Sequence, residues 1–365
     1  MLVIVALCVR RLRTLQHATY RKARRITERI LLSFVILLCV VLAGTTSYNT
    51  AALRYYHAIY PPPGKLYQVG GYDMHLYCTG EGSPTLVLEA GAGAESIVWV
   101  KVQPELSKLT RVCSYDRAGY GWSAPRPGPR DADTVAQQLH ALLQQAGITG
   151  PLVLMGHSMG GIYIRDYASQ YPQGIKGLIF LDPGTPTMEQ HQSPELHAAT
   201  AIRAPFSYSL VAVAMLRLHR PAGSCAPEPG LDEPAGKRFA QLECGKLLNS
   251  VWTEYKSEPQ SEAETMNTGP YGDLPVLIIS RDTKLAGQTQ GLTPKLAAEF
   301  LAFWDQEQED LKRLSTRSRR IIAKGSGHQI QLDRADLLNR EVAVFIQQIR
   351  NNNEQRSDYG STMTE

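Results

Sequence analysis

A serine between two glycines, in Gly-His-Ser-Met-Gly at 156–160, is the stretch of the chain best suited to nucleophilic chemistry. Four apolar residues, Leu152–Met155, precede it, and the helix-like segment Ile162–Ala168 follows it. This order predicts a strand that turns sharply into a helix and lifts the Ser158 hydroxyl above the edge of a sheet. The glycines leave room for the close contacts of such a turn. The N–H of Met159, at the start of the helix, would face a substrate oxyanion.

A serine hydroxyl is a weak nucleophile until a base accepts its proton, and His328 is the candidate base. It ends the turn Lys-Gly-Ser-Gly-His, which follows a predicted strand and whose small residues would let the loop approach Ser158. We expect His328 to act as general base towards Ser158 and then as general acid towards the leaving group. Asp282, after the preceding strand, is the favoured carboxylate to orient the His328 ring. Asp182, one strand earlier, is the alternative.

Short apolar strands alternate with helix-like segments through most of the chain. The expected strands are 66–69, 74–78, 85–89, 111–115, 152–155, 177–181, 274–280 and 320–323, and the expected helices are 99–109, 131–146, 162–168 and 335–349. This alternation predicts an α/β fold with a mostly parallel sheet covered by helices on both faces. It stops over residues 184–272, which we expect to form a helical cap over the carboxyl edge of the sheet, where ligands bind.

Charge is concentrated at one end of the chain. The net charge is +4, but residues 1–30 carry +7, which leaves −3 for the rest. The body therefore has no basic patch that would indicate nucleic-acid binding. The histidines, His157 beside the serine among them, lack the spacing of a metal site. No metal site is expected.

The N-terminal region predicts a membrane segment. A basic arm, 1–29, precedes an apolar stretch, 30–48, that is long enough for a short transmembrane signal-anchor. By the positive-inside rule the arm would be cytoplasmic and the body extracytoplasmic. A cleaved signal peptide, with the body secreted, is the alternative. Residues 49–64, ending in Pro-Pro-Pro-Gly, are expected to form an extended linker, and the polar tail 351–365 is expected to be disordered.

Four cysteines outside the apolar N-terminal stretches allow three disulfide pairings. Cys78 and Cys113 lie on predicted strands near the start of the sheet, and Cys225 and Cys244 lie in the middle region. We expect these two pairs to form disulfides, with buried free thiols as the alternative.

The motifs at 152–161, at 325–328 and in Tyr-Asp-Arg-Ala-Gly-Tyr-Gly-Trp-Ser at 115–123 resemble those of the α/β-hydrolase superfamily, in its branch of esterases, peptidases and epoxide hydrolases. The resemblance covers residues 65–350, apart from the cap. It implies an eight-stranded sheet, no cofactor, and a catalytic triad of Ser158, Asp282 and His328.

The resemblance also assigns a second oxyanion donor to the turn after the third strand. The family usually has His-Gly there, whereas this chain has Ala-Gly-Ala at 90–92. Ala92 is the favoured donor and Gly91 the alternative. The family's longer turn before the acid is shortened here to Arg281-Asp282, which keeps Asp182 in consideration.

These residues predict a serine hydrolase that forms an acyl-enzyme on Ser158, with a carboxylesterase as the first hypothesis and a small-molecule ester as substrate. A peptidase, lactonase or acyltransferase would use the same triad. The alternative of another class is a catalytically silent binding scaffold tethered to the membrane. The sequence does not indicate an oligomeric state.

Overall fold

The computed structural model describes residues 2–15, 22–188, 190–201, 230–231, 234–243, 247–285, 289 and 291–361. Its centre is an eight-stranded sheet in the order β1-β2-β4-β3-β5-β6-β7-β8. The strands are β1 (Lys65–Val69), β2 (Tyr72–Thr79), β3 (Thr85–Glu89), β4 (Val112–Tyr115), β5 (Leu152–His157), β6 (Ile175–Leu181), β7 (Val276–Arg281) and β8 (Ser318–Ala323). Only the pairings β1–β2 and β2–β4 are antiparallel. The predicted mostly parallel sheet is therefore confirmed.

Two apolar layers enclose the sheet, because alternate residues of each central strand point to opposite faces. On one face, Leu152 and Leu154 of β5 pack with residues of α4 (Ala132–Gln145) and α5 (Met159–Gln170). On the other face, Val153 and Met155 pack with α3 (Gln103–Leu106) and α13 (Ala335–Ser361). The central strands β3, β5 and β7 are buried throughout, which explains their continuous apolar sequences.

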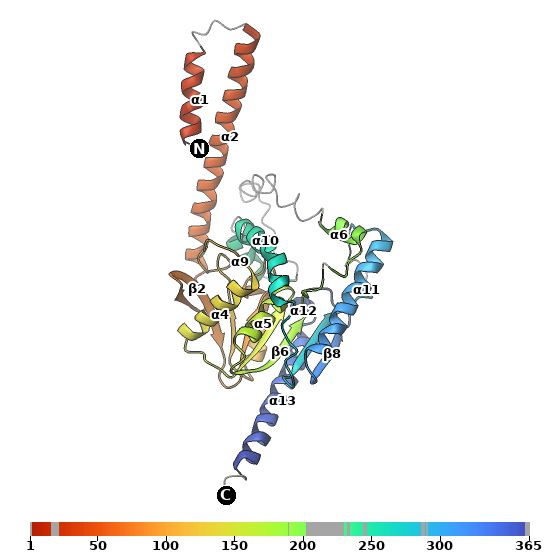
Figure 1. The fold of residues 1–365 in the computed structure, drawn as a ribbon. Helices are drawn as coiled ribbons and strands as arrows, with labels where there is room; N and C mark the ends of the chain where they lie inside the picture. The colour runs from red at the N-terminus through yellow and green to blue at the C-terminus, as the bar shows by residue number, and fades with distance from the viewer. Residues whose placement is uncertain are drawn as a thin grey trace.

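The segment between β6 and β7 contains the described cap helices α6 (Pro194–Ala201), α9 (Ala235–Glu243) and α10 (Leu247–Thr265). Of these, α10 packs on both α4 and α5 (Figure 1). The described part of this segment thus contains helices, and α10 packs on the body.

A long helix after β7 was not predicted. The helix α11 (Pro294–Asp310) follows β7 and begins at Thr293, whose hydroxyl accepts a hydrogen bond from the Leu296 N–H. Proline at its first position and an N-cap threonine are ordinary signals of a helix start. This helix contacts β7 and α6.

The N-terminal part forms two helices, α1 (Leu2–Thr14) and α2 (Lys22–Ile59), which lie side by side and project from the body (Figure 1). Within the described residues, α2 alone is long and apolar enough to cross a membrane. It continues to Ile59, well into the predicted extended linker 49–64, because no proline occurs before Pro61. Likewise α13 runs to Ser361, past the end predicted at 349.

The disulfide between Cys78 and Cys113 is confirmed, and it joins paired residues of β2 and β4. Cys8 and Cys39, in the N-terminal helices, are free. The predicted partners Cys225 and Cys244 lie outside the described residues.

We expect the double variant Cys78→Ala, Cys113→Ala to unfold at a lower temperature than the wild type. The disulfide closes a loop of 35 residues. Because this restricts the unfolded chain, it contributes about 3–4 kcal/mol to the free energy of unfolding. Thermal unfolding of the full-length protein in detergent, with and without a reductant, measures the effect. Reductant should lower the wild-type midpoint and leave that of the variant unchanged. An equal midpoint in both proteins without reductant would contradict the prediction.

Candidate active site

Ser158 lies at the turn between β5, which ends at His157, and α5, which begins at Met159. Its backbone has φ 53° and ψ −124°, in the left-handed region that serine rarely adopts. The flanking glycines permit this turn. A Cβ on Gly156 would lie 2.3 Å from the Gly160 carbonyl oxygen, and one on Gly160 would lie 2.6 Å from the Glu89 carbonyl oxygen. The turn is therefore the tight strand-to-helix connection expected from the sequence.

The carboxylate next to His328 belongs to Asp182. Its Oδ2 lies 2.6 Å from His328 Nδ1. Asp182 follows β6, the neighbour of β5, and its N–H donates to the Ile279 carbonyl of β7. The backbone of Asp182 has φ 44°. Among the described residues other than glycine, only Asp182 and Ser158 have a positive φ. Strained backbone angles of this kind cluster at functional sites.

The prediction that Asp282 orients His328 is wrong. The Asp282 carboxylate instead accepts the N–H groups of Gly325 and Lys284. The cause is the register of β7, which continues through Arg281, paired with Ala323 of β8. Because the Arg281 side chain points to Asp182, the next residue along the strand points away from it.

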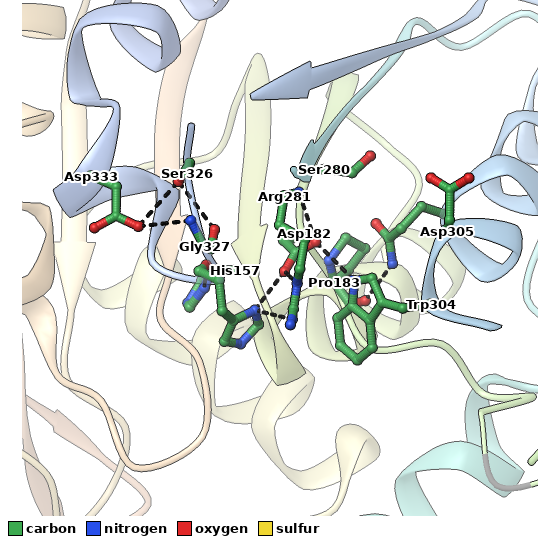
Figure 2. A network of polar contacts seen from close by, with 12 residues as sticks. His157, Asp182, Pro183, Ser280, Arg281, Trp304, Asp305, Ser326, Gly327 and Asp333 are labelled. Atoms are coloured by element: carbon green, nitrogen blue, oxygen red, sulfur yellow. Dashed lines mark hydrogen bonds and ion pairs between the residues drawn. The ribbon is translucent and has the colours of Figure 1, made fainter. Parts of the chain in front are cut away.

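Asp182 is buried, and donors from three elements hold its carboxylate (Figure 2). Arg281 donates its backbone N–H to Oδ1 at 3.0 Å and its Nε–H to Oδ2 at 2.6 Å. Trp304 Nε1 of α11 donates to Oδ1 at 2.9 Å. Burial by itself would raise the Asp182 pKa, but the bond from His328 and the charge of Arg281 lower the pKa to about 2. Asp182 is therefore ionised at neutral pH.

The His328 loop is fixed from several sides. Asp333 Oδ2 accepts the Gly327 N–H at 3.0 Å and the Ser326 hydroxyl at 3.2 Å (Figure 2). The His328 carbonyl oxygen lies 2.9 Å from His157 Nε2. Because a carbonyl oxygen can only accept, His157 Nε2 is protonated and donates this hydrogen bond. Burial, followed by the charge of His328, lowers the His157 pKa to about 3 and keeps its ring neutral.

Two ring nitrogens of His328 have different surroundings. Nδ1 lies 2.6 Å from Asp182 Oδ2 and 2.7 Å from Arg281 Nη2. We assign the Nδ1 proton to the bond with Asp182, because an ionised carboxylate can only accept. Arg281 Nη2, which can only donate, then makes no hydrogen bond to Nδ1. Nε2 then keeps its lone pair and can take a proton. The His328 ring lies 4.6 Å, centroid to centroid, from the ring of His157, the residue before Ser158.

The predicted oxyanion donors are the N–H groups of Ala92 and Met159. Ala92 packs against a cluster that includes Met159. A Cβ on Gly91 would lie 3.0 Å from Ser158 Cβ, so the loop passes directly beside the serine. Within the described residues, neither the Ala92 N–H nor the Met159 N–H has a hydrogen-bond acceptor. Neither N–H group is therefore engaged elsewhere in the described structure, which an oxyanion donor requires.

Sequence analysis missed Trp304 and Arg281, which both contact Asp182. The Arg281 guanidinium carbon lies 4.0 Å from the centre of the Trp304 ring, and that ring meets the His328 ring edge-on at 5.8 Å. The helix-start signal at Thr293-Pro294 would have revealed α11. No sequence signal connects Trp304 to residue 182, because their contact spans 122 residues.

The described residues contain no group of three or more histidine, cysteine, aspartate or glutamate side chains that could hold a metal ion. What the site offers is a nucleophile, an ionised carboxylate bonded to an imidazole, and two free backbone donors. That set of groups can support acyl transfer through a covalent intermediate.

The family model of the alpha/beta hydrolase fold matches residues 84–212. The uncharacterised protein YbdG of Bacillus subtilis is 26% identical over 291 residues, which cover 76% of this chain and 88% of that protein. Both matches include the Ser158 turn, and YbdG extends the similarity over most of the body.

Solved structures share the fold. An esterase from Thermogutta terrifontis is 20% identical, with a TM-score of 0.56, and the match covers 78% of this chain and 98% of the esterase. The enol-lactonase of Burkholderia xenovorans LB400 is also 20% identical, with a TM-score of 0.54. That match covers 78% of this chain and 100% of the enol-lactonase. The matched family model, the eight-stranded sheet and the similarity to these structures show that this chain has the α/β-hydrolase fold.

Proposed function

We propose that this protein is a serine hydrolase that cleaves carboxylic esters through an acyl-enzyme on Ser158. The observation that carries the proposal is the bond between His328 and the buried, ionised Asp182, which follows β6, the neighbour of the strand that leads into Ser158. His328 is the base, and Asp182 replaces Asp282 as the acid of the triad. The N–H groups of Met159 and Ala92 form the oxyanion hole.

The proposed reaction follows from these assignments. His328 Nε2 accepts the Ser158 hydroxyl proton as the oxygen attacks the ester carbonyl carbon, and Asp182 stabilises the resulting imidazolium. The two backbone N–H groups bind the oxyanion of the tetrahedral intermediate. The intermediate collapses as His328 returns the proton to the leaving alkoxide, which departs as an alcohol. A water molecule then attacks the acyl-enzyme by the same steps and releases the carboxylic acid and free Ser158.

The N-terminal helix suggests where this chemistry occurs. We propose that α2 spans the membrane as a signal-anchor, with the basic arm cytoplasmic and the hydrolase domain on the extracytoplasmic side. The Cys78–Cys113 disulfide supports this topology, because structural disulfides persist in oxidising compartments. Cleavage after the apolar stretch would instead release the domain.

Fold alone does not choose among acyl-transfer reactions, since an esterase and an enol-lactonase both share it. A peptidase, a lactonase or an acyltransferase would differ from an esterase only in the acyl donor or acceptor. Product analysis separates these reactions. A silent scaffold would show neither turnover nor covalent labelling.

The full-length protein in detergent should hydrolyse p-nitrophenyl esters of graded acyl length, and Ser158→Ala should abolish this activity because it removes the nucleophile. A fluorophosphonate probe should label the wild type and not the variant. Activity that survives in Ser158→Ala would disprove the acyl-enzyme mechanism. Neither hydrolysis nor labelling by folded wild-type protein would favour the scaffold.

Asp182→Asn should lower kcat by about 10³- to 10⁴-fold, because a neutral amide neither stabilises the imidazolium nor holds the required tautomer. Asp282→Asn is the matched control. Its amide oxygen can still accept the Gly325 N–H, so kcat should stay within about threefold of wild type. Esterase kinetics on both variants make the comparison, and the opposite ranking would restore Asp282 as the acid.

Trp304→Phe removes one donor to Asp182 and keeps a large ring beside Arg281 and His328. Loss of a buried hydrogen bond to a charged group corresponds to a decrease in kcat of about 10-fold. The esterase assay measures it, with a circular dichroism melt to check folding. An unchanged kcat in a folded variant would show that this bond is unnecessary for catalysis.

A further inference from the structure

A buried carboxylate from the cap lies next to the loop that would form the oxyanion hole. Glu254, on α10, is 1% exposed. Its Oε1 accepts Arg117 Nε at 2.8 Å and the Tyr163 hydroxyl at 3.1 Å. Its Oε2 accepts the Gly93 N–H at 3.0 Å and the Tyr120 hydroxyl at 2.7 Å. The proposed reaction uses none of these groups directly.

Arg117 also binds this loop. Its guanidinium donates from Nη1 to the Ala90 carbonyl and from Nη2 to the Gly91 carbonyl, both at 2.7 Å. Nη1 also donates to Glu89 at 2.7 Å. The two carbonyls before Ala92 are thus bound to Arg117, and the N–H after it is bound to Glu254.

The geometry of a peptide plane turns these contacts into a constraint on Ala92. The Ala92 N–H belongs to the same trans peptide unit as the Gly91 carbonyl, and the two groups point in opposite directions. Because Arg117 binds that carbonyl, the Ala92 N–H must point away from Arg117. Gly91 itself lies against Ser158, as the 3.0 Å approach of its would-be Cβ shows.

A buried ion pair of this kind is weak evidence for stability, since desolvation of both charges offsets much of their attraction. A role in geometry explains the arrangement better. The planar Arg117 fork binds two successive carbonyls and Glu254 at once, which a single charge on a flexible chain could not do.

We propose that Arg117 and Glu254 are positioning residues that fix the direction of the Ala92 N–H, so that the cap helix α10 completes the oxyanion hole. This inference rests on the proposed acyl-enzyme function. Loss of this positioning should affect the transition state more than the bound substrate. Misdirection of the donor weakens binding of the tetrahedral oxyanion and leaves binding of the ground-state ester almost unchanged.

Glu254→Gln tests the proposal in the full-length protein. Glutamine has a single accepting oxygen, so it cannot accept from both Arg117 and Gly93, and its NH₂ group would face one of these two donors. We therefore expect kcat to fall by about 10- to 100-fold, with KM within about twofold of the wild type. The affinity for phenylboronic acid, which forms a tetrahedral adduct on the serine, should fall in parallel. A merely structural role would lower the melting temperature without separating kcat from KM.

Glu264→Gln is the matched control on the same helix. Glu264 accepts the Asp133 N–H of α4 at 3.0 Å and does not touch the oxyanion loop. Its kcat and boronate affinity should equal those of the wild type. If Glu254→Gln does not fold, Tyr120→Phe serves instead, because it removes one donor from the oxygen that binds Gly93. Its kcat should fall by about threefold at unchanged KM.

An unchanged kcat and boronate affinity in the folded Glu254→Gln protein, or in Tyr120→Phe if that variant is needed, would overturn the inference. So would a loss confined to KM. These outcomes differ from failure of the proposed function, which would appear as unlabelled wild-type protein or as an active Ser158→Ala variant.

Discussion

The site depends on how the Asp182 carboxylate is held. It is buried, and it stays ionised because Arg281, Trp304 and His328 all direct N–H groups at its two oxygens. These donors come from β7, from α11 and from the loop after β8, so three segments must pack correctly before the carboxylate can exist as an anion there. Asp182 thus links the part of the sheet next to Ser158 to the last third of the chain.

Both residues with strained backbone, Ser158 and Asp182, follow adjacent parallel strands, after the paired residues His157 and Leu181. Parallel pairing brings the strand ends to the same edge of the sheet, and the surrounding contacts hold the unfavourable angles there. Glycines at 156 and 160 supply the space that the first turn needs. Hydrogen bonds from Ser158 N–H to Leu181 and from Asp182 N–H to Ile279 hold the two turns to their neighbouring strands.

The cap helix α10 also forms hydrogen bonds to the body of the domain. It is bound to the loop at 115–123 and to the start of α4, through Ser250 to Gly119 and through Ser257 to the Arg130 N–H. The sequence of that loop therefore has a structural purpose: Arg117 reaches the turn after β3, and Tyr120 reaches Glu254. Rigid elements that carry a site place its donors more accurately than free loops do.

The sequence by itself determined the α/β fold and the turn from strand to helix at Ser158, because these depend on local pattern: apolar strands and glycine spacing. It favoured the Cys78–Cys113 disulfide but left free thiols as the alternative, and the structure forms that bond. Only the tertiary structure decided which aspartate meets His328. Both candidates follow neighbouring strands, and the choice turned on β7 continuing through Arg281, which reverses the direction of residue 282. The tertiary structure also brought Trp304 to Asp182 and Glu254 to Arg117, since contacts across 122 and 137 residues leave no local trace in a single sequence.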